Sequence, residues 1–272
     1  MTPDASRPVV LVGAGKMGGA LLDGWLAHGM APAAVVVIDP GLAAGRRAEL
    51  SGRGVTVADA PPAGVRAGVL MLAVKPQMMD AVLPTLAPLR DEATLVVSIA
   101  AGTTIGRIET GLGAGPVVRA MPNTPAQIGM GTTVCVANAA AGAAARRTVT
   151  ELLSAIGTVD WLDEEAGIDA VTAVSGSGPA YVFLLAECLA AAGRAEGLPA
   201  GLAAKIARGT VAGAGALLAR SPLDPGTLRA DVTSPGGTTA AALKRLMADD
   251  GLERLITEAV HRAAERSRRL GG

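Results

Sequence analysis

Residues 234–239 read SPGGTT and stand directly before an apolar, helix-like run, and their types suit the binding of an anion. The first N–H groups of a helix have no partner within it, and the helix dipole places positive charge there. Glycines, which lack a Cβ, let an anion approach the backbone closely. A plain helix cap needs only one Ser or Thr side chain. We therefore interpret this segment as an anion-binding turn rather than as a simple cap.

A second chemical signal is the glycine pattern GAGKMG, in which Gly13, Gly15 and Gly18 follow the β-rich residues 9–12 and open a helix-like run. In a dinucleotide site the first glycine permits a tight turn, the second lets the pyrophosphate approach, and the third lets helix and strand pack closely. A glycine-rich turn without a ligand is the alternative. We expect this segment to line a nucleotide cofactor, with contacts from Val12, Gly13, Ala14, Gly15, Lys16, Met17 and Gly18.

Asp39 ends the second expected strand, VVVID, about 20 residues beyond the glycine motif, where an acidic side chain binds the adenosine ribose. A carboxylate there favours NADH over NADPH, because it would repel a 2′-phosphate. Arg46 and Arg47 follow closely. These two arginines either weaken the preference for NADH or are solvated charges on a helix.

Two further strand ends, LAVKPQ and SIAAG, carry small or special residues. Ligands of open α/β sheets bind beyond the carboxyl ends of the strands, so these loops should border the cofactor. We expect Lys75, held extended before Pro76, to shape its loop rather than transfer protons. The cofactor contacts expected here are Ala73, Val74, Lys75, Pro76, Ile99, Ala100 and Ala101.

The elements that must position these residues change character along the chain. Apolar, β-rich runs at 9–12, 35–38, 69–74, 95–99, 117–119 and 132–136 alternate with helix-like runs, which predicts βαβ units and a sheet covered on both faces. After residue 162 the pattern is helical, at 164–173, 180–192, 200–218, 239–248 and 252–270. The fold class is therefore α/β, a Rossmann-like doubly wound sheet over 1–162 followed by an all-helical domain over 163–272.

The helical domain is too small to bury all of its apolar helices, which indicates an oligomer interface. The 24 basic and 24 acidic residues cancel, so neither a nucleic acid nor an anionic membrane is an expected partner. Two histidines and two cysteines show no zinc spacing, and no metal is expected. The apolar run 180–192 contains Glu187 and is short for a membrane span. With no signal peptide evident, a cytoplasmic location is expected.

Three segments together resemble the pyrroline-5-carboxylate reductase family: VVRAMPNTPAQIGMG (117–131), AVSGSGPAYVF (173–183) and VTSPGGTTAAAL (232–243). The resemblance covers nearly the whole chain in the expected order. It implies hydride transfer from NADPH or NADH to Δ1-pyrroline-5-carboxylate, a cyclic imine with one carboxylate, giving L-proline; the family commonly uses NADPH. It also implies a helical domain that interleaves with a partner in a homodimer, often assembled into decamers, and a site to which the partner contributes.

The resemblance also implies roles for single residues. The Ser234 hydroxyl and the N–H groups of Gly237 and Thr238 would hold the substrate carboxylate, and the Thr239 hydroxyl would face the ring nitrogen as the catalytic contact. Asp231 departs from relatives that carry Asn. The substrate contacts expected are Ser234, Pro235, Gly236, Gly237, Thr238, Thr239, Asn123, Glu165 and Asp231. We expect the glycines of SGSGP to be structural and leave Ser177 without a role.

Three rival functions deserve comparison. A β-hydroxyacid dehydrogenase needs a Lys with an Asn one helical turn later. In this sequence the residue one turn after Lys205 is Gly209, and the residue one turn after Lys244 is Ala248, so neither Lys fits. Reduction of a different cyclic imine stays open, because the sequence does not measure ring size. A nucleotide-sensing protein without activity would need only the nucleotide half, and the intact SPGGTT and MPNTPA segments argue against it.

Overall fold

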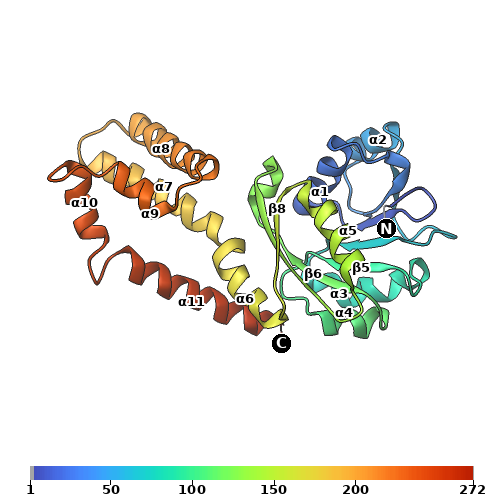
Figure 1. Cartoon of the computed structure of the whole chain (residues 1–272). Helices are drawn as coiled ribbons and strands as arrows, with labels where there is room; N and C mark the ends of the chain where they lie inside the picture. Colours follow the sequence, from blue (N-terminus) through green and yellow to red (C-terminus); the bar gives the residue numbers. More distant parts are fainter. Residues whose placement is uncertain (1–2, 272) are drawn as a thin grey trace. The chain divides into compact units, whose positions relative to one another are not determined.

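The sheet of this protein has eight strands in the order β3-β2-β1-β4-β5-β6-β7-β8, as seen in a computed structural model that describes residues 3–271 (Figure 1). Every neighbouring pair is parallel except β6 and β7, which are antiparallel. The strands are β1 (Val9–Val12), β2 (Val35–Ile38), β3 (Thr56–Ala58), β4 (Val69–Leu72), β5 (Leu95–Ser98), β6 (Val117–Met121), β7 (Gly131–Ala137) and β8 (Gly157–Trp161).

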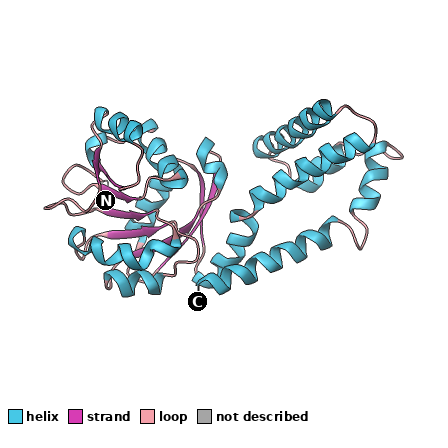
Figure 2. Ribbon diagram, turned by 180° about the vertical axis from the view of Figure 1, so that it is seen from behind, coloured by secondary structure: helices cyan, strands magenta, loops and turns pink. Residues whose placement is uncertain are grey.

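Helices cover both faces of the sheet (Figure 2), as the apolar runs predict. On one face, α1 (Lys16–Ala27), α2 (Ala44–Gly52) and α5 (Ala143–Ser154) pack on the core, and the Trp25 indole N–H donates to the Leu152 carbonyl at 2.8 Å. On the other face lie α3 (Met79–Val82), the 3₁₀ stretch Leu83–Leu89 and α4 (Ile105–Leu112). Every residue of β1, β2, β4 and β5 is buried. The predicted fold class is confirmed.

After β8 the chain is helical. A 3₁₀ turn, Glu165–Gly167, leads into α6 (Ile168–Val171) and a π-helical turn, Thr172–Gly176. The remaining helices are α7 (Gly178–Ala195), α8 (Ala200–Arg220), α9 (Pro225–Asp231), α10 (Thr238–Leu246) and α11 (Leu252–Gly271). Small residues let α7 and α8 pack closely, since a Cβ on Gly193 would lie 3.4 Å from the Ala203 Cβ.

Contacts divide the chain into two compact units. The first contains the residues up to Gly176 together with those from Ala264 onward, and the second is Ser177–Ala263. The segment after residue 162, which the sequence places in the helical domain, therefore groups with the sheet as far as Gly176. Ile168 shows why, because it is fully buried in the apolar cluster that contains Ile108 and Leu112.

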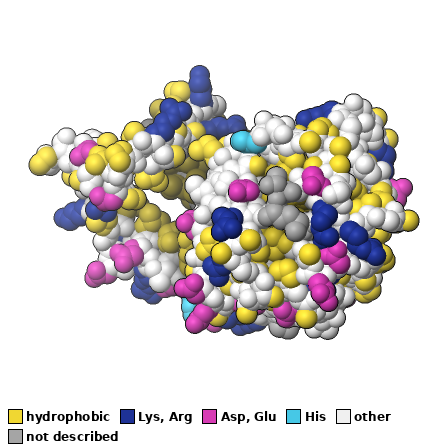
Figure 3. Space-filling model, turned by 45° about the vertical axis from the view of Figure 1, so that its right-hand side comes forward, with side chains coloured by type: hydrophobic (Ala, Val, Ile, Leu, Met, Phe, Trp, Pro, Cys, Tyr) yellow, Lys and Arg dark blue, Asp and Glu magenta, His cyan; other side chains and the backbone are white. Residues whose placement is uncertain are grey.

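The second unit exposes many large apolar side chains. Phe183 on α7 is 63% exposed and Leu217 on α8 is 56% exposed, and hydrophobic side chains are visible on the helical unit at the left of Figure 3. By length and composition alone, the helical stretches Glu165–Ala195 and Ala200–Arg220 are long and apolar enough to cross a membrane. The first of them contains the run 180–192 and extends beyond it. Helices that are covered by another subunit have the same character.

Candidate active site

The glycine loop between β1 and α1 has the conformation that a dinucleotide requires. Gly13 is left-handed, with φ +91°, and a Cβ there would lie 2.9 Å from the Ala73 carbonyl oxygen. A Cβ on Gly18 would overlap the Gly13 carbonyl oxygen. By contrast, a Cβ on Gly15 would meet no atom within 4 Å. Gly15 is also the N-cap of α1, with no side chain capping the helix, so its open side fits a pyrophosphate.

Asp39 fastens this loop to the end of β2. Its Oδ2 accepts a hydrogen bond from the Ala14 N–H at 2.8 Å, and its Oδ1 accepts one from the Gly41 N–H at 2.9 Å. Each carboxylate oxygen has a second lone pair for a further donor. The side chain that the sequence assigns to the ribose therefore also fixes the backbone around it.

Both arginines after Asp39 are paired. Arg46 forms ion pairs with Asp23 and with Glu49. Arg47 pairs with Asp59 and donates to the Asp39 carbonyl at 3.2 Å. These contacts fit the interpretation of the two arginines as helix charges.

The loops after β4 and β5 lie at the same edge of the sheet as the glycine loop. The register places Leu72 beside Val12 and beside Ser98, so the three strands end level with one another. The Ala73 N–H donates to the Val12 carbonyl at 2.8 Å, and the Ile99 N–H donates to the Leu72 carbonyl at 3.0 Å. Lys75 is exposed and precedes the 3₁₀ turn Pro76–Met78. The expected cofactor residues are thus brought together.

Asn123 joins two motifs that lie far apart in the sequence. Its Nδ2 donates to the Ser175 hydroxyl at 3.1 Å, and its Oδ1 accepts from the Thr132 N–H at 2.9 Å. Next to it, a Cβ on Gly176 would lie 2.6 Å from the Met121 Cε. The loop after β6 is therefore packed on the π-helical turn, a feature often found at functional sites. Ser175 is not among the site residues expected from the sequence, in which Ser177 of SGSGP has no assigned role. No local pattern in the sequence indicates that Ser175 pairs with Asn123.

Glu165 makes two strong contacts inside the sheet unit. Its Oε1 accepts from Arg119 Nη1 at 2.8 Å and from the Ile105 N–H, at the start of α4, at 2.9 Å. The Arg119 side chain is 5% exposed, and that of Glu165 is 30% exposed. The carboxylate that the resemblance places near the substrate thus compensates a buried guanidinium.

The SPGGTT turn contains no side-chain cap. Gly236 is left-handed, with φ +73°, and Gly237 is the extended N-cap of α10. The Gly237 N–H donates to the Ser234 carbonyl at 3.0 Å, so that N–H is already used and differs in this from the resemblance-based expectation. Within the described part of the chain, no acceptor binds the N–H groups of Thr238 and Thr239. The turn presents a free helix N-terminus of the kind that binds anions.

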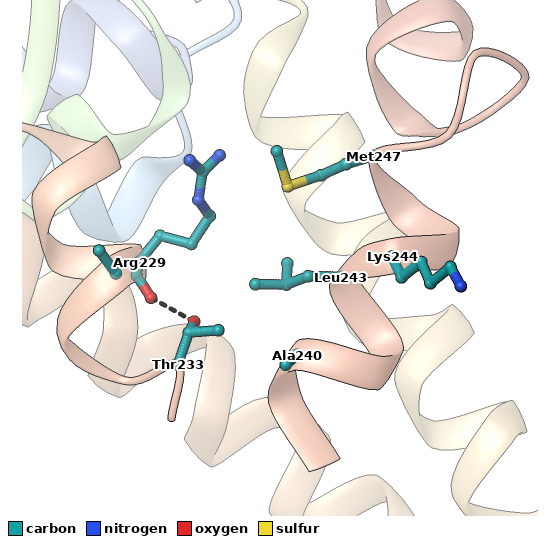
Figure 4. A pocket seen from close by; sticks show the side chains of 7 residues that line it. Arg229, Thr233, Ala240, Leu243, Lys244 and Met247 are labelled. Atoms are coloured by element: carbon teal, nitrogen blue, oxygen red, sulfur yellow. Dashed lines mark hydrogen bonds between the residues drawn. The ribbon is translucent and has the colours of Figure 1, made fainter. Parts of the chain in front are cut away.

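An open groove of about 520 Å³ lies between α9 and α10, next to this turn. In Figure 4 the Leu243 and Met247 side chains and the Arg229 guanidinium face the groove, whereas the Lys244 ammonium points away. The Thr233 hydroxyl donates to the Arg229 carbonyl at 2.6 Å, which fixes the end of α9. Asp231 is exposed in the last turn of α9.

Comparison with known proteins gives a consistent result. Residues 165–270 match a family model described as pyrroline-5-carboxylate reductase dimerisation, and residues 8–102 match one described as NADP oxidoreductase, coenzyme F420-dependent. The chain is 43% identical over 265 residues to a pyrroline-5-carboxylate reductase of Pseudomonas aeruginosa, covering 96% of each chain.

Solved structures agree with these matches. A pyrroline-5-carboxylate reductase from Coxiella burnetii superposes with a TM-score of 0.90 at 32% identity, covering 98% of this chain and 99% of that one. A Plasmodium falciparum pyrroline carboxylate reductase with NADP bound superposes with a TM-score of 0.79 at 26% identity, covering 98% and 99%.

Proposed function

This chain belongs to the pyrroline-5-carboxylate reductase family and reduces pyrroline-5-carboxylate to proline with NAD(P)H, and we propose specific roles for its residues in that reaction. The observation that carries the proposal is the uncapped start of α10, where the N–H groups of Thr238 and Thr239 follow two glycines. A substrate with one carboxylate suits such a helix start.

The bound cofactor supplies a hydride to the imine carbon, while the protein orients the two reactants. We propose that the loop from Val12 to Gly18 holds the pyrophosphate. Ala73–Pro76 and Ile99–Ala101 then border the rest of the cofactor. The open space beside Gly15 and the two close-packed glycines on either side support this assignment.

For the substrate, the Ser234 hydroxyl and the free N–H groups of Thr238 and Thr239 hold the carboxylate. Gly236 and Pro235 shape the turn, and the Gly237 N–H closes it. The Thr239 hydroxyl hydrogen-bonds the ring nitrogen. A cyclic imine is partly protonated near neutral pH, so orientation supplies much of the rate without a strong general acid. Asp231 would stabilise the protonated ring.

Asn123 and Glu165 act on the substrate through their loops. Asn123 holds the segment after β6, and Glu165 holds the start of α4 through Ile105. Both side chains already bind protein groups, which supports an indirect role.

The test is oxidation of NADH and of NADPH with and without Δ1-pyrroline-5-carboxylate, alongside a six-membered imine carboxylate. Thr239→Ala should lower kcat about 10-fold or more, with Thr239→Ser restoring most of it. Ser234→Ala should raise the KM for the imine several-fold, by roughly 1 kcal/mol of lost binding. Faster turnover of the six-membered imine carboxylate than of Δ1-pyrroline-5-carboxylate would show that the larger ring is the preferred substrate. Wild-type kinetics in Thr239→Ala would exclude Thr239 from the mechanism.

We propose that NADH is preferred, because a 2′-phosphate would meet the Asp39 carboxylate while Arg46 and Arg47 are engaged elsewhere. The wild-type kcat/KM for NADH should exceed that for NADPH by about 10-fold. Asp39→Asn should lower this NADH-to-NADPH ratio of kcat/KM. A wild-type preference for NADPH would contradict the proposal.

The protein forms an oligomer, as the match of residues 165–270 to the dimerisation model indicates. We propose a homodimer assembled through the exposed apolar surface of the second unit, further joined into a decamer and located in the cytoplasm. Light scattering should give the mass of ten chains for the wild type and a smaller species for Phe183→Asp. A monomeric wild-type protein would refute the assembly.

A further inference from the structure

The last turns of α11 are packed differently from the rest of that helix. Of its described residues two are buried, Ala264 and Ser267, which lie on one helical face. Leu255, earlier in the helix, is 60% exposed. Contacts place Ala264 and the residues after it with the sheet unit, although the first part of the helix belongs to the second unit.

A part-buried hydrogen bond fixes this helix end. The Ser267 hydroxyl donates to Asp169 Oδ1 at 2.5 Å, and Ser267 is only 6% exposed. Asp169 lies in the first turn of α6. Hydrogen bonds to an ionised carboxylate are stronger than those between neutral groups. The pair therefore fastens α11 to the segment that carries Glu165.

The same helix end contacts the loop after β5. Gly102 is left-handed, with φ +69°, and a Cβ there would lie 3.2 Å from the Leu270 carbonyl oxygen. A Cβ on Gly271 would lie 3.7 Å from the Gly102 carbonyl oxygen. Two backbones thus approach each other closely, which only a glycine at this left-handed position allows without strain.

The loop itself is held weakly by its own hydrogen bonds. The Ala100 N–H reaches the Ser98 hydroxyl oxygen at 3.3 Å, and the Thr103 N–H reaches the Ala100 carbonyl at 3.4 Å. Both distances are long for an N–H···O bond. Ile99 is fixed by its N–H bond to the Leu72 carbonyl, so it is the turn at residues 100–102 that relies on the helix end packed against Gly102.

We infer that the end of α11, fixed by Ser267, is a positioning element for the cofactor loop 99–102. The inference rests on the proposed function, in which Ile99, Ala100 and Ala101 border NAD(P)H. Residues 247–251 alone separate α10, which begins at the substrate turn, from α11. The helix that comes after α10 in the chain thus ends on the loop that holds the cofactor.

The experiment compares the Kd for NADH, from fluorescence titration, with the KM for the imine. Ser267→Ala should raise the Kd for NADH about 5-fold, with a smaller change in the KM for the imine. Asp169→Asn keeps the Oδ1 acceptor but loses its charge, so it should raise the Kd for NADH less than Ser267→Ala does, whereas Asp169→Ala should match Ser267→Ala. Thr257→Ala removes an exposed hydroxyl from the same helix and is the control.

A second variant, a chain that ends at Arg269, removes the Leu270 contact with Gly102 but keeps Ser267. This variant should also weaken NADH binding. It provides the test of the inference if Ser267→Ala does not fold. NADH affinities within about twofold of the wild type in folded Ser267→Ala, Asp169→Ala and the chain that ends at Arg269 would overturn the inference. Wild-type reduction of the imine is measured in parallel, so failure of the inference with an active wild type is distinct from failure of the proposed function.

Discussion

Replacing Glu165 separates a structural role from a substrate contact. In Glu165→Ala the Arg119 guanidinium, with its side chain 5% exposed, loses its anion, and the Ile105 N–H loses its acceptor. Removing one partner of a buried pair costs about 3–5 kcal/mol, while an exposed pair contributes about 0–1 kcal/mol. The Glu165 side chain is 30% exposed, so water reaches one side of this pair.

The expected loss for Glu165→Ala is therefore at the lower end of the buried range, about 3 kcal/mol in the free energy of unfolding. For a chain of this size that is a fall of about 6–12 °C in Tm. Glu165→Gln keeps an oxygen that can accept from Ile105 and Arg119. It should cost only about 1 kcal/mol, the difference between a charged and a neutral acceptor.

The assay is thermal and urea unfolding at fixed protein concentration, with kcat and the KM for the imine measured on the same samples. Tm should decrease in the order wild type, Glu165→Gln, Glu165→Ala, and the KM for the imine should change little while the protein stays folded. A wild-type Tm together with a raised KM in both variants would refute it. That result would instead place the carboxylate against the substrate.

Three further predictions concern other parts of the sheet unit. Gly15→Ala should leave Tm unchanged but weaken NADH binding, because its Cβ meets no protein atom, whereas Gly18→Ala should lower Tm, because its Cβ overlaps the Gly13 carbonyl; equal Tm values would contradict this. The Arg7 guanidinium holds the pKa of Asp91 well below its usual range, so the stabilisation is complete above the ordinary carboxyl pKa, about 4, and is lost as pH falls below it. The Tm gap between wild type and Asp91→Asn should therefore be constant at neutral pH and shrink in acid. Burial raises the pKa of Cys135 to about 12, so iodoacetamide at pH 8 should modify it only after unfolding, as mass spectrometry would detect.

The sequence predicts the central sheet well because its signal is local. The expected runs 9–12 and 35–38 match β1 and β2, whose residues are all buried and apolar. The two strands that were missed, β3 and β8, are the edges of the sheet. β8 contains Asp160 and alternates between half-buried and exposed residues. Edge strands lack the continuous apolar pattern that marks a buried strand.

The contacts of the site depend on pairs that lie far apart in sequence. Asn123 and Ser175 are 52 residues apart, and Arg119 and Glu165 are 46 apart. A motif can identify such residues as important, but it does not say whether they bind a ligand or each other. The Gly237 N–H illustrates the same limit at short range, because its use within the turn follows from the backbone conformation.

The discontinuous first unit also has a consequence for folding. Ser267 and Asp169 are separated by 98 residues, so this contact forms only after the whole second unit has been synthesised. Non-local contacts of this kind slow folding, because the chain loses loop entropy before it gains the contact. During translation the sheet can assemble early, but the loop after β5 receives its last support when the final helix leaves the ribosome.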